Sequence, residues 1–179
     1  MAPMAEVRIR RAAPTDLPAI VDRWRELMAV HTALHSALYA LAPHAAETYA
    51  ATVRRQMSDV SCVVLVAEGA AAEPGGRAAT LDGYLTGGVG LRAPIYAHRE
   101  VGMIFDVSVR PDCQRNGVGT ALLATVDAWF TRKGLDFIQV DFAPGNALSE
   151  AFWRKNGFEV LLSEAYRVPR CDPPLGNRI

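Results

Sequence analysis

A strand-like run that ends at a proline and is soon followed by two glycines constrains this chain more than any other feature. Residues 103–109 are mostly β-branched or apolar, and Pro111 ends the run. Gly117 and Gly119 then stand where a helical pattern begins. This order predicts a strand, a short polar turn and a helix N-terminus, in which both glycines allow close backbone approach or a positive φ.

The predicted turn is a candidate anion site. Main-chain N–H groups at a helix N-terminus lack intrahelical partners, and the helix dipole adds positive potential, so converging N–H groups suit a phosphate or pyrophosphate. We expect these groups to come from Gln114, Arg115, Asn116, Gly117, Val118 and Gly119. No Gly-Lys-Ser/Thr follows the glycines and the spacing Gly-x-Gly-x-x-Gly is absent, so the turn matches neither a P-loop nor a dinucleotide fingerprint.

Two segments together carry a family resemblance. Residues 109–119 follow the pattern Val-x-Pro-x-x-Gln-Arg-x-Gly-x-Gly, which resembles the coenzyme A loop of the GNAT superfamily of N-acetyltransferases. Residues 146–158 read Asn-Ala-Leu-Ser-Glu-Ala-Phe-Trp-Arg-Lys-Asn-Gly-Phe, and resemble the family's later motif, in which an Asn opens a helix that ends in an aromatic pair and Gly-Phe. The resemblance covers roughly residues 62–168.

The resemblance implies a mixed, twisted α/β sheet with helices on both faces, whose central two parallel strands splay apart to admit coenzyme A. From the residue pattern we expect strands at 7–11, 62–68, 81–91, 101–109, 137–142, 158–162 and 166–168. We expect helices from Thr15 or Asp16 to about 31, from about 43 to 57, from 118 to Gly134, and at 146–156. Strand, helix and strand over 101–142 should form a parallel, right-handed unit, with earlier strands in antiparallel hairpins.

Composition limits the alternatives. With 179 residues, half of them hydrophobic, we expect one domain over residues 1–179, with a core at about 7–168, an exposed hairpin loop at 69–80 and a Pro-rich tail at 169–179. A net charge of zero favours neither nucleic acid nor an anionic membrane, and no apolar run is long enough to span a bilayer. The three cysteines are too widely spaced for a disulfide framework or a zinc motif, so we expect a reducing cytoplasm.

Coenzyme A should extend from the turn onto the neighbouring strand. Its pantetheine arm is an amide chain that can pair with an exposed strand backbone, for which Val107 and Val109 are well placed. A strand-bulge N–H near Val107 could bind the developing oxyanion. The resemblance adds Asn146 and Trp153 to this coenzyme A site.

An attacking amine must be neutral, whereas a free alkylamine is mostly protonated at neutral pH, so a base or a selective pocket is needed. Asp141 and Asp106 each interrupt a strand that should be apolar, and ionisable groups there are candidates for perturbed pKa values. Asp141 is the first choice, since it lies five residues before Asn146, where some family members place a catalytic Glu. Alternatively, each carboxylate caps a loop or pairs with an arginine.

Trp153 departs from the family pattern. The family often has Tyr at this position, and that Tyr protonates the leaving thiolate, whereas indole has no titratable proton in range. A thiolate with a pKa near about 8.5 is already a fair leaving group, so we expect Trp153 to pack near the thiol end of pantetheine. The same departure leaves open a protein that binds acyl-CoA without turnover.

The first helix and the segment after it should cover the acceptor side, where the resemblance places His31, His35, Tyr39 and Trp24. His31 and His35 share a helical face, but no third ligand is suggested, so we expect no metal. Cys113 lies near a helix N-terminus that could lower its thiol pKa, yet direct transfer needs no protein thiol.

These observations predict an acetyl-CoA-dependent N-acetyltransferase that acts directly, without a covalent acyl-enzyme. The alternatives are a non-catalytic acyl-CoA-binding module and a transferase for another acyl group. We expect a small-molecule or peptide amine as acceptor, and no acidic cluster favours polyamines or basic peptides. A homodimer is left open.

Overall fold

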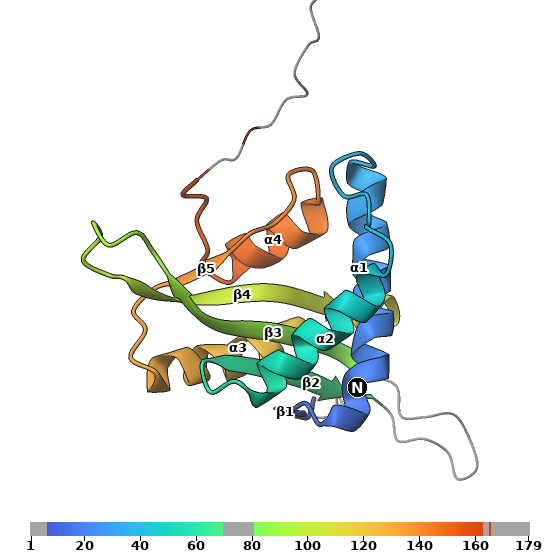
Figure 1. Ribbon diagram of the computed structural model, residues 1–179, viewed down its shortest axis with the longest axis horizontal. Coiled ribbons are helices and arrows are strands. Elements are labelled where there is room, and N and C mark those ends of the chain that lie inside the picture. Colours follow the sequence, from blue (N-terminus) through green and yellow to red (C-terminus); the bar gives the residue numbers. More distant parts are fainter. Residues whose placement is uncertain (1–6, 70–80, 163–164, 166–179) are drawn as a thin grey trace, which may run out of the picture.

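The computed structural model describes residues 7–69, 81–162 and 165, and Figure 1 shows a sheet with helices packed on its faces. The strands are β1 (Ile9–Arg11), β2 (Cys62–Glu68), β3 (Leu81–Leu91), β4 (Glu100–Val109) and β5 (Ile138–Val140). The helices are α1 (Leu17–Leu34), α2 (Ala45–Ser58), α3 (Val118–Arg132) and α4 (Ala147–Lys155), with short 3-10 turns at Pro14–Asp16 and Pro111–Cys113. Among these described residues, no helix is both long enough and apolar enough to cross a membrane.

The five strands form one mixed sheet in the order β1-β2-β3-β4-β5. The first three pairings are antiparallel, and β4 pairs with β5 in parallel. The predicted parallel unit of strand, helix and strand is therefore confirmed, with α3 as its connection.

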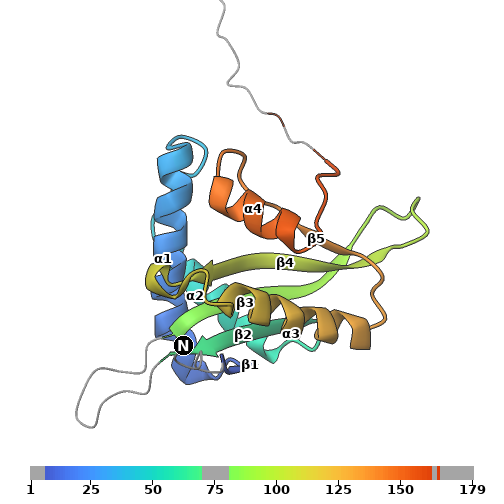
Figure 2. The same ribbon diagram turned by 180° about the vertical axis from the view of Figure 1, so that it is seen from behind.

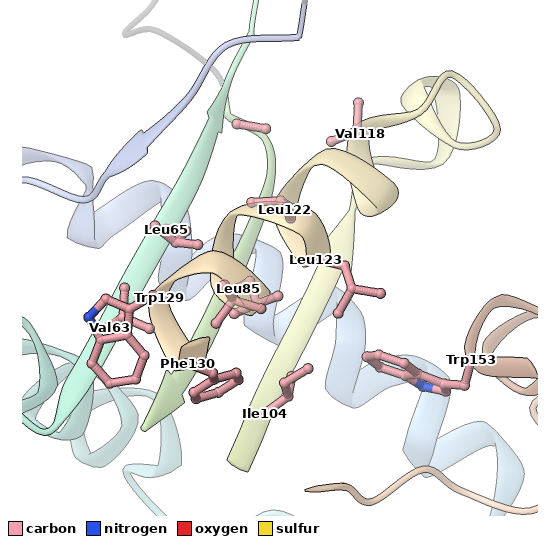
Figure 3. Close-up of a cluster of buried hydrophobic side chains, with 12 residues drawn as sticks. Val63, Leu65, Leu85, Ile104, Val118, Leu122, Leu123, Trp129, Phe130 and Trp153 are labelled. Carbon is pink, nitrogen blue, oxygen red and sulfur yellow. The ribbon is translucent and has the colours of Figure 1, made fainter. Parts of the chain in front are cut away.

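The sheet separates two apolar cores, because alternate residues of a strand point to opposite faces. On one face, Val63 and Leu65 of β2 pack in a core with Leu122 and Phe130 of α3 (Figure 3). On the other face, Val64 and Val66 pack against α1 and α2. Figures 1 and 2 show these two layers from opposite sides, with α1 and α2 on one face and α3 on the other. The predicted helices on both faces are confirmed.

An extra residue interrupts the pairing of β3 with β4. Thr86 lies opposite Asp106, but the next residue, Gly87, lies opposite Ile104, so Phe105 is a β-bulge. The predicted bulge near Val107 is present, two residues earlier in the strand.

The parallel pairing is short. It joins Gly102 to Ile138, Met103 to Gln139 and Ile104 to Val140. β5 ends there, rather than at the predicted residue 142, while β4 continues to Val109. The last part of β4 therefore has no strand partner from β5.

The predicted strand at residues 158–162 is wrong. Gly157 turns the chain in the left-handed region (φ +84°), and residues 158–162 have no regular structure. Val160, Leu161 and Leu162 are exposed, and strand propensity has little effect without a half-buried sheet surface to fit. Its expected partner at 166–168, most of the loop at 69–80 and the tail at 169–179 lie outside the described residues.

Candidate active site

The turn between β4 and α3 combines two residues in the left-handed region with a helix N-terminus. Arg115 and Gly117 both lie in the left-handed region (φ +63° and +85°), and Gly117 is the N-cap of α3. Turns in which right-handed and left-handed residues alternate can direct their N–H groups toward a common point, and the helix dipole adds positive potential. The predicted strand, turn and helix N-terminus are therefore present.

Two residues of the predicted loop have other tasks. The main-chain N–H of Gln114 donates to the Pro111 oxygen (3.4 Å), so the expectation that this N–H group is unpaired is wrong. Gly119 lies within the first turn of α3 rather than at a positive φ. A Cβ there would lie 3.0 Å from the Phe152 ring of α4, so Gly119 permits close packing of the two helices.

The free edge of β4 presents main-chain groups beside this turn. Arg110 donates its N–H to the Asp82 oxygen (2.8 Å), which directs the main-chain groups of residues 106, 108 and 110 toward β3. Val107 and Val109 therefore direct theirs to the opposite side, where β5 has already ended. The bulge at Phe105 causes this arrangement, because the extra residue reverses the alternation along β4. Before the bulge, Gly102 is a residue that faces the β5 side, and its N–H donates to the Phe137 oxygen. After the bulge, Val107 and Val109 face that side.

One group on this edge is already paired. The Gln114 side chain donates through Nε2 to the Val109 carbonyl oxygen at 3.2 Å. The Val109 N–H and both main-chain groups of Val107 remain directed outward. The side chains of the two valines pack into the core on the α3 face.

Asp106 is held by hydroxyl groups on the other face of the sheet. Its Oδ2 accepts hydrogen bonds from the Tyr49 hydroxyl (3.0 Å) and from Thr86 Oγ1 (3.3 Å). Burial raises the pKa of Asp106, although these hydrogen bonds oppose the shift. Asp106 is therefore half-buried within β4, and its pKa is shifted as the sequence predicted.

Sequence reasoning did not assign Tyr49 or Tyr84 to the site. Their hydroxyl oxygens lie 3.1 Å apart, and burial raises the pKa of both well above the ordinary tyrosine value. Tyr49 therefore stays protonated and donates to Asp106, and Tyr84 can donate to the Tyr49 oxygen. The pairing of Tyr49 with Asp106 joins two elements far apart in sequence, so no local pattern predicts it.

The four residues predicted for the acceptor side fall into two groups, one buried behind Tyr49 and one half-buried near the end of α1. Trp24 is buried and stacks on Tyr49, with ring centroids 4.4 Å apart. His31 stacks on Tyr39 at 5.1 Å, and burial lowers the pKa of His31, against the opposing effect of Asp106. The His35 Nδ1 accepts from the Leu38 N–H (3.1 Å). Trp24 thus supports Tyr49 from behind, while His31, His35 and Tyr39 are half-buried.

Asp141 does not lie inside a strand. It follows the end of β5 and is exposed, so the expectation that it interrupts a buried strand is wrong. The cause is the early end of β5 at Val140.

Asn146 and Trp153 hold α4 in place. The Asn146 Oδ1 accepts the Ser149 N–H (3.1 Å) and caps the helix. Trp153 is 2% exposed, and its Nε1 donates to the Ser149 Oγ at 3.0 Å. Figure 3 shows the indole beyond β4, on the side away from β3. Its indole N–H is thus satisfied within α4.

Two further expectations concern metals and thiols. Within the described ranges, no group of three His, Cys, Asp or Glu side chains could hold a metal ion. Burial, together with Asp82, raises the pKa of the Cys113 thiol, so the expected lowering by the helix N-terminus is wrong. Cys113 instead packs against the core on the α3 face.

Solved structures similar to this one include a tetramutant of the BH1408 protein from Bacillus halodurans (TM-score 0.71, 14% identity, 91% of this chain and 99% of that chain). Another is the aminoglycoside acetyltransferase AAC(6')-Iy with the bisubstrate analogue CoA-S-monomethyl-acetylneamine (0.70, 18%, 93% and 100%). A third is AAC(6')-Ih from Acinetobacter baumannii (0.66, 16%, 93% and 100%). At these identities the likeness shows a shared fold. Comparison with curated proteins gave no match.

The family comparison is more specific. The model of the acetyltransferase (GNAT) family matches residues 32–158, which include the turn after β4, the Asp106 cluster and α4. The match extends through more than half of the chain and contains both sequence motifs. The chain therefore belongs to the acetyltransferase (GNAT) family, as its sequence predicted, and is an N-acetyltransferase that uses acetyl-CoA as co-substrate.

Proposed function

We propose that this enzyme transfers the acetyl group of acetyl-CoA directly to the amino group of a small molecule, with Asp106 as the base. Coenzyme A lies with its pyrophosphate on residues 115–119 and its pantetheine along the free edge of β4. The outward main-chain groups of Val107 and Val109 support this path, since they match an added strand. The end of the parallel pairing at Ile104 and Val140 also supports this path, since pantetheine would lie beyond it.

The position of Asp106 carries the proposal. It is a half-buried carboxylate one residue before Val107, so it lies where pantetheine would bring the thioester. Among the described residues, both hydrogen bonds to its carboxylate go to Oδ2, which leaves Oδ1 to accept a proton from the amine. Tyr49 and Thr86 fix the carboxylate in this orientation, and Trp24 fixes Tyr49.

The reaction balances with these groups alone. Asp106 takes a proton from the acceptor ammonium and passes it to water, which leaves a neutral amine. The amine nitrogen then attacks the thioester carbonyl carbon, the C–N bond forms, and the C–S bond breaks. Coenzyme A leaves as a thiolate and takes up the second amine proton through water. An ammonium ion and a thioester thus give an amide, a thiol and one proton, with Trp153 packed beside the site as an apolar neighbour.

Two further observations support direct transfer and a cytoplasmic location. One similar structure holds a bisubstrate analogue that joins coenzyme A to acetylneamine, which is the kind of ligand that direct transfer predicts. Cys62 and Cys113 are free thiols, which fits the cytoplasm. We also propose that the described residues act as one domain, since one sheet carries the whole candidate site.

Matched variants of the two carboxylates test the base. Asp106→Asn should lower the rate of coenzyme A release by about 100-fold at neutral pH, within the usual range for a lost general base, with partial recovery at high pH where free amine is abundant. Asp141→Asn should change the rate by less than about threefold. Coenzyme A affinity, measured by calorimetry, should stay the same in both variants. The opposite ranking would make Asp141 the base, and binding without release would favour a non-catalytic module.

A further inference from the structure

The segment over the acceptor side carries no formal charge. Residues 27–46 contain no Asp, Glu, Lys or Arg, although about a fifth of the whole chain (21%) is charged. The segment comprises the second half of α1, the following loop and the start of α2. Its titratable side chains are His31, His35, Tyr39 and His44.

The inner face of α1 continues past the part that the sheet covers. Leu17, Ile20, Val21 and Trp24 are buried against the sheet, and helical spacing carries the same face on to His31 and Leu34. Figure 1 shows this end of α1 extending past the sheet, beside the segment that precedes α4. Leu34 confirms the contact, since its Cδ2 lies 3.9 Å from the position of a Cβ on Gly145.

Large apolar side chains are exposed along this segment. Val30 is 48% exposed, Leu34 38%, Leu38 52% and Leu41 51%. The loop folds back on α1, because the Thr32 hydroxyl donates to the Tyr39 oxygen (3.2 Å) and Tyr39 stacks on His31. Val30 and Leu34 on α1, and Leu38 and Leu41 in the loop that folds back on it, are together called the α1 wall.

The α1 wall adjoins the proposed base. His31 lies between them, since it stacks on Tyr39 of the wall segment and also interacts electrostatically with Asp106. Asp106 faces Tyr49, Tyr84, Thr86 and His31, all uncharged at neutral pH. The site thus offers one negative charge beside apolar and aromatic surface, which suits one ammonium group with an apolar body.

We propose that the acceptor is a small monoamine whose apolar body lies on the α1 wall while its amino group reaches Asp106, so polycations are poor substrates. This rests on the proposed function of the Asp106 site. A second ammonium group on the acceptor would lose hydration against Val30, Leu34, Leu38 and Leu41 without gaining a carboxylate partner within residues 27–46.

Hexylamine and 1,6-diaminohexane test this directly, since they share a six-carbon chain and differ by one terminal amino group. We expect kcat/KM for hexylamine to be at least about tenfold higher, with spermidine and neamine as poor as the diamine. The dissociation constants of the two amines, measured by calorimetry on protein saturated with coenzyme A, should differ in the same direction. Leu34→Asp should narrow or reverse the preference. Val60→Asp, on an exposed residue between α2 and β2, should leave it unchanged.

The acetylation rates and the dissociation constants together separate the monoamine proposal from the proposed mechanism. Acetylation of the diamine, spermidine or neamine at least as fast as hexylamine would overturn the monoamine proposal and leave the transferase mechanism intact. Preferential binding of hexylamine without any acetylation would support the wall and overturn the mechanism. Weak binding of every amine, without acetylation, would overturn both. If Leu34→Asp leaves the preference for hexylamine unaltered, the apolar body of the acceptor does not lie on the α1 wall.

Discussion

Asp106 combines a cost in stability with a proposed role in catalysis. Burial raises its pKa in the folded state above the ordinary value of 3.8, so between these two pKa values the folded protein binds more protons than the unfolded chain. The free energy of unfolding therefore loses this contribution as pH rises through that window, and at neutral pH the ionised carboxylate is a net cost. Asp106 is accordingly a residue that packing alone would not select.

Asp106→Asn should relieve this cost. At pH 7 we expect its free energy of unfolding, measured by urea titration, to equal or exceed that of the unmodified protein, with the difference shrinking toward pH 4. The amide oxygen of the variant can still accept from Tyr49 and Thr86. Asp141→Asn, on an exposed residue, serves as control and should show no such pH dependence. A clear loss of stability in Asp106→Asn at pH 7 would show that the ionised carboxylate stabilises the fold through its hydroxyl partners.

At the scale of elements, glycines set how closely α3 approaches the sheet. A Cβ on Gly102 of β4 would lie 2.8 Å from the Phe130 ring, and one on Gly87 of β3 would lie 2.9 Å from the Met103 main-chain oxygen and 3.4 Å from the same ring. The glycine-rich strand β3 thus combines a bulge opposite Thr86 and Gly87 with close packing against α3. The close approach helps α3 hold the turn at its N-terminus against β4.

Gly102→Ala should therefore destabilise the protein by about 1–3 kcal/mol, the usual cost of overpacking a core. Thermal unfolding measures the loss. The double variant Gly102→Ala with Phe130→Leu should recover part of it, because the smaller side chain vacates the space that the methyl group needs. If the double variant shows the sum of two independent losses, Phe130 is not the neighbour that makes Gly102 necessary.

The elements that sequence predicted best are those whose signals are local. β2 and β3 have the predicted bounds, and Gly134 and Gly157 follow the ends of α3 and α4 in the left-handed conformation. The wrong predictions concern strands that depend on pairing with a neighbouring strand. β5 ends early and residues 158–162 form no strand, because strand formation depends on neighbours that a local pattern does not specify.

At the scale of the molecule, the candidate site depends on contacts between distant segments. The motifs predicted the turn after β4, and they suggested a main-chain role for Val107 and Val109 that stays a prediction. They did not predict that Tyr49 of α2 would hold Asp106, since this hydrogen bond joins residues 57 positions apart. Asp141 ranked first in the sequence because of its spacing from Asn146, whereas burial in the folded chain favours Asp106.

The central claim is that coenzyme A lies along the free edge of β4 and on the turn before α3, and amide hydrogen exchange measured by NMR tests it most directly. Coenzyme A should slow exchange at Val107, Val109 and residues 115–119, and leave the β2 amides unchanged. Pantetheine, which lacks the nucleotide, should slow Val107 and Val109 alone. If coenzyme A binds while the exchange of Val107 and Val109 stays the same, the thioester does not reach Asp106 along this edge, and the account is wrong.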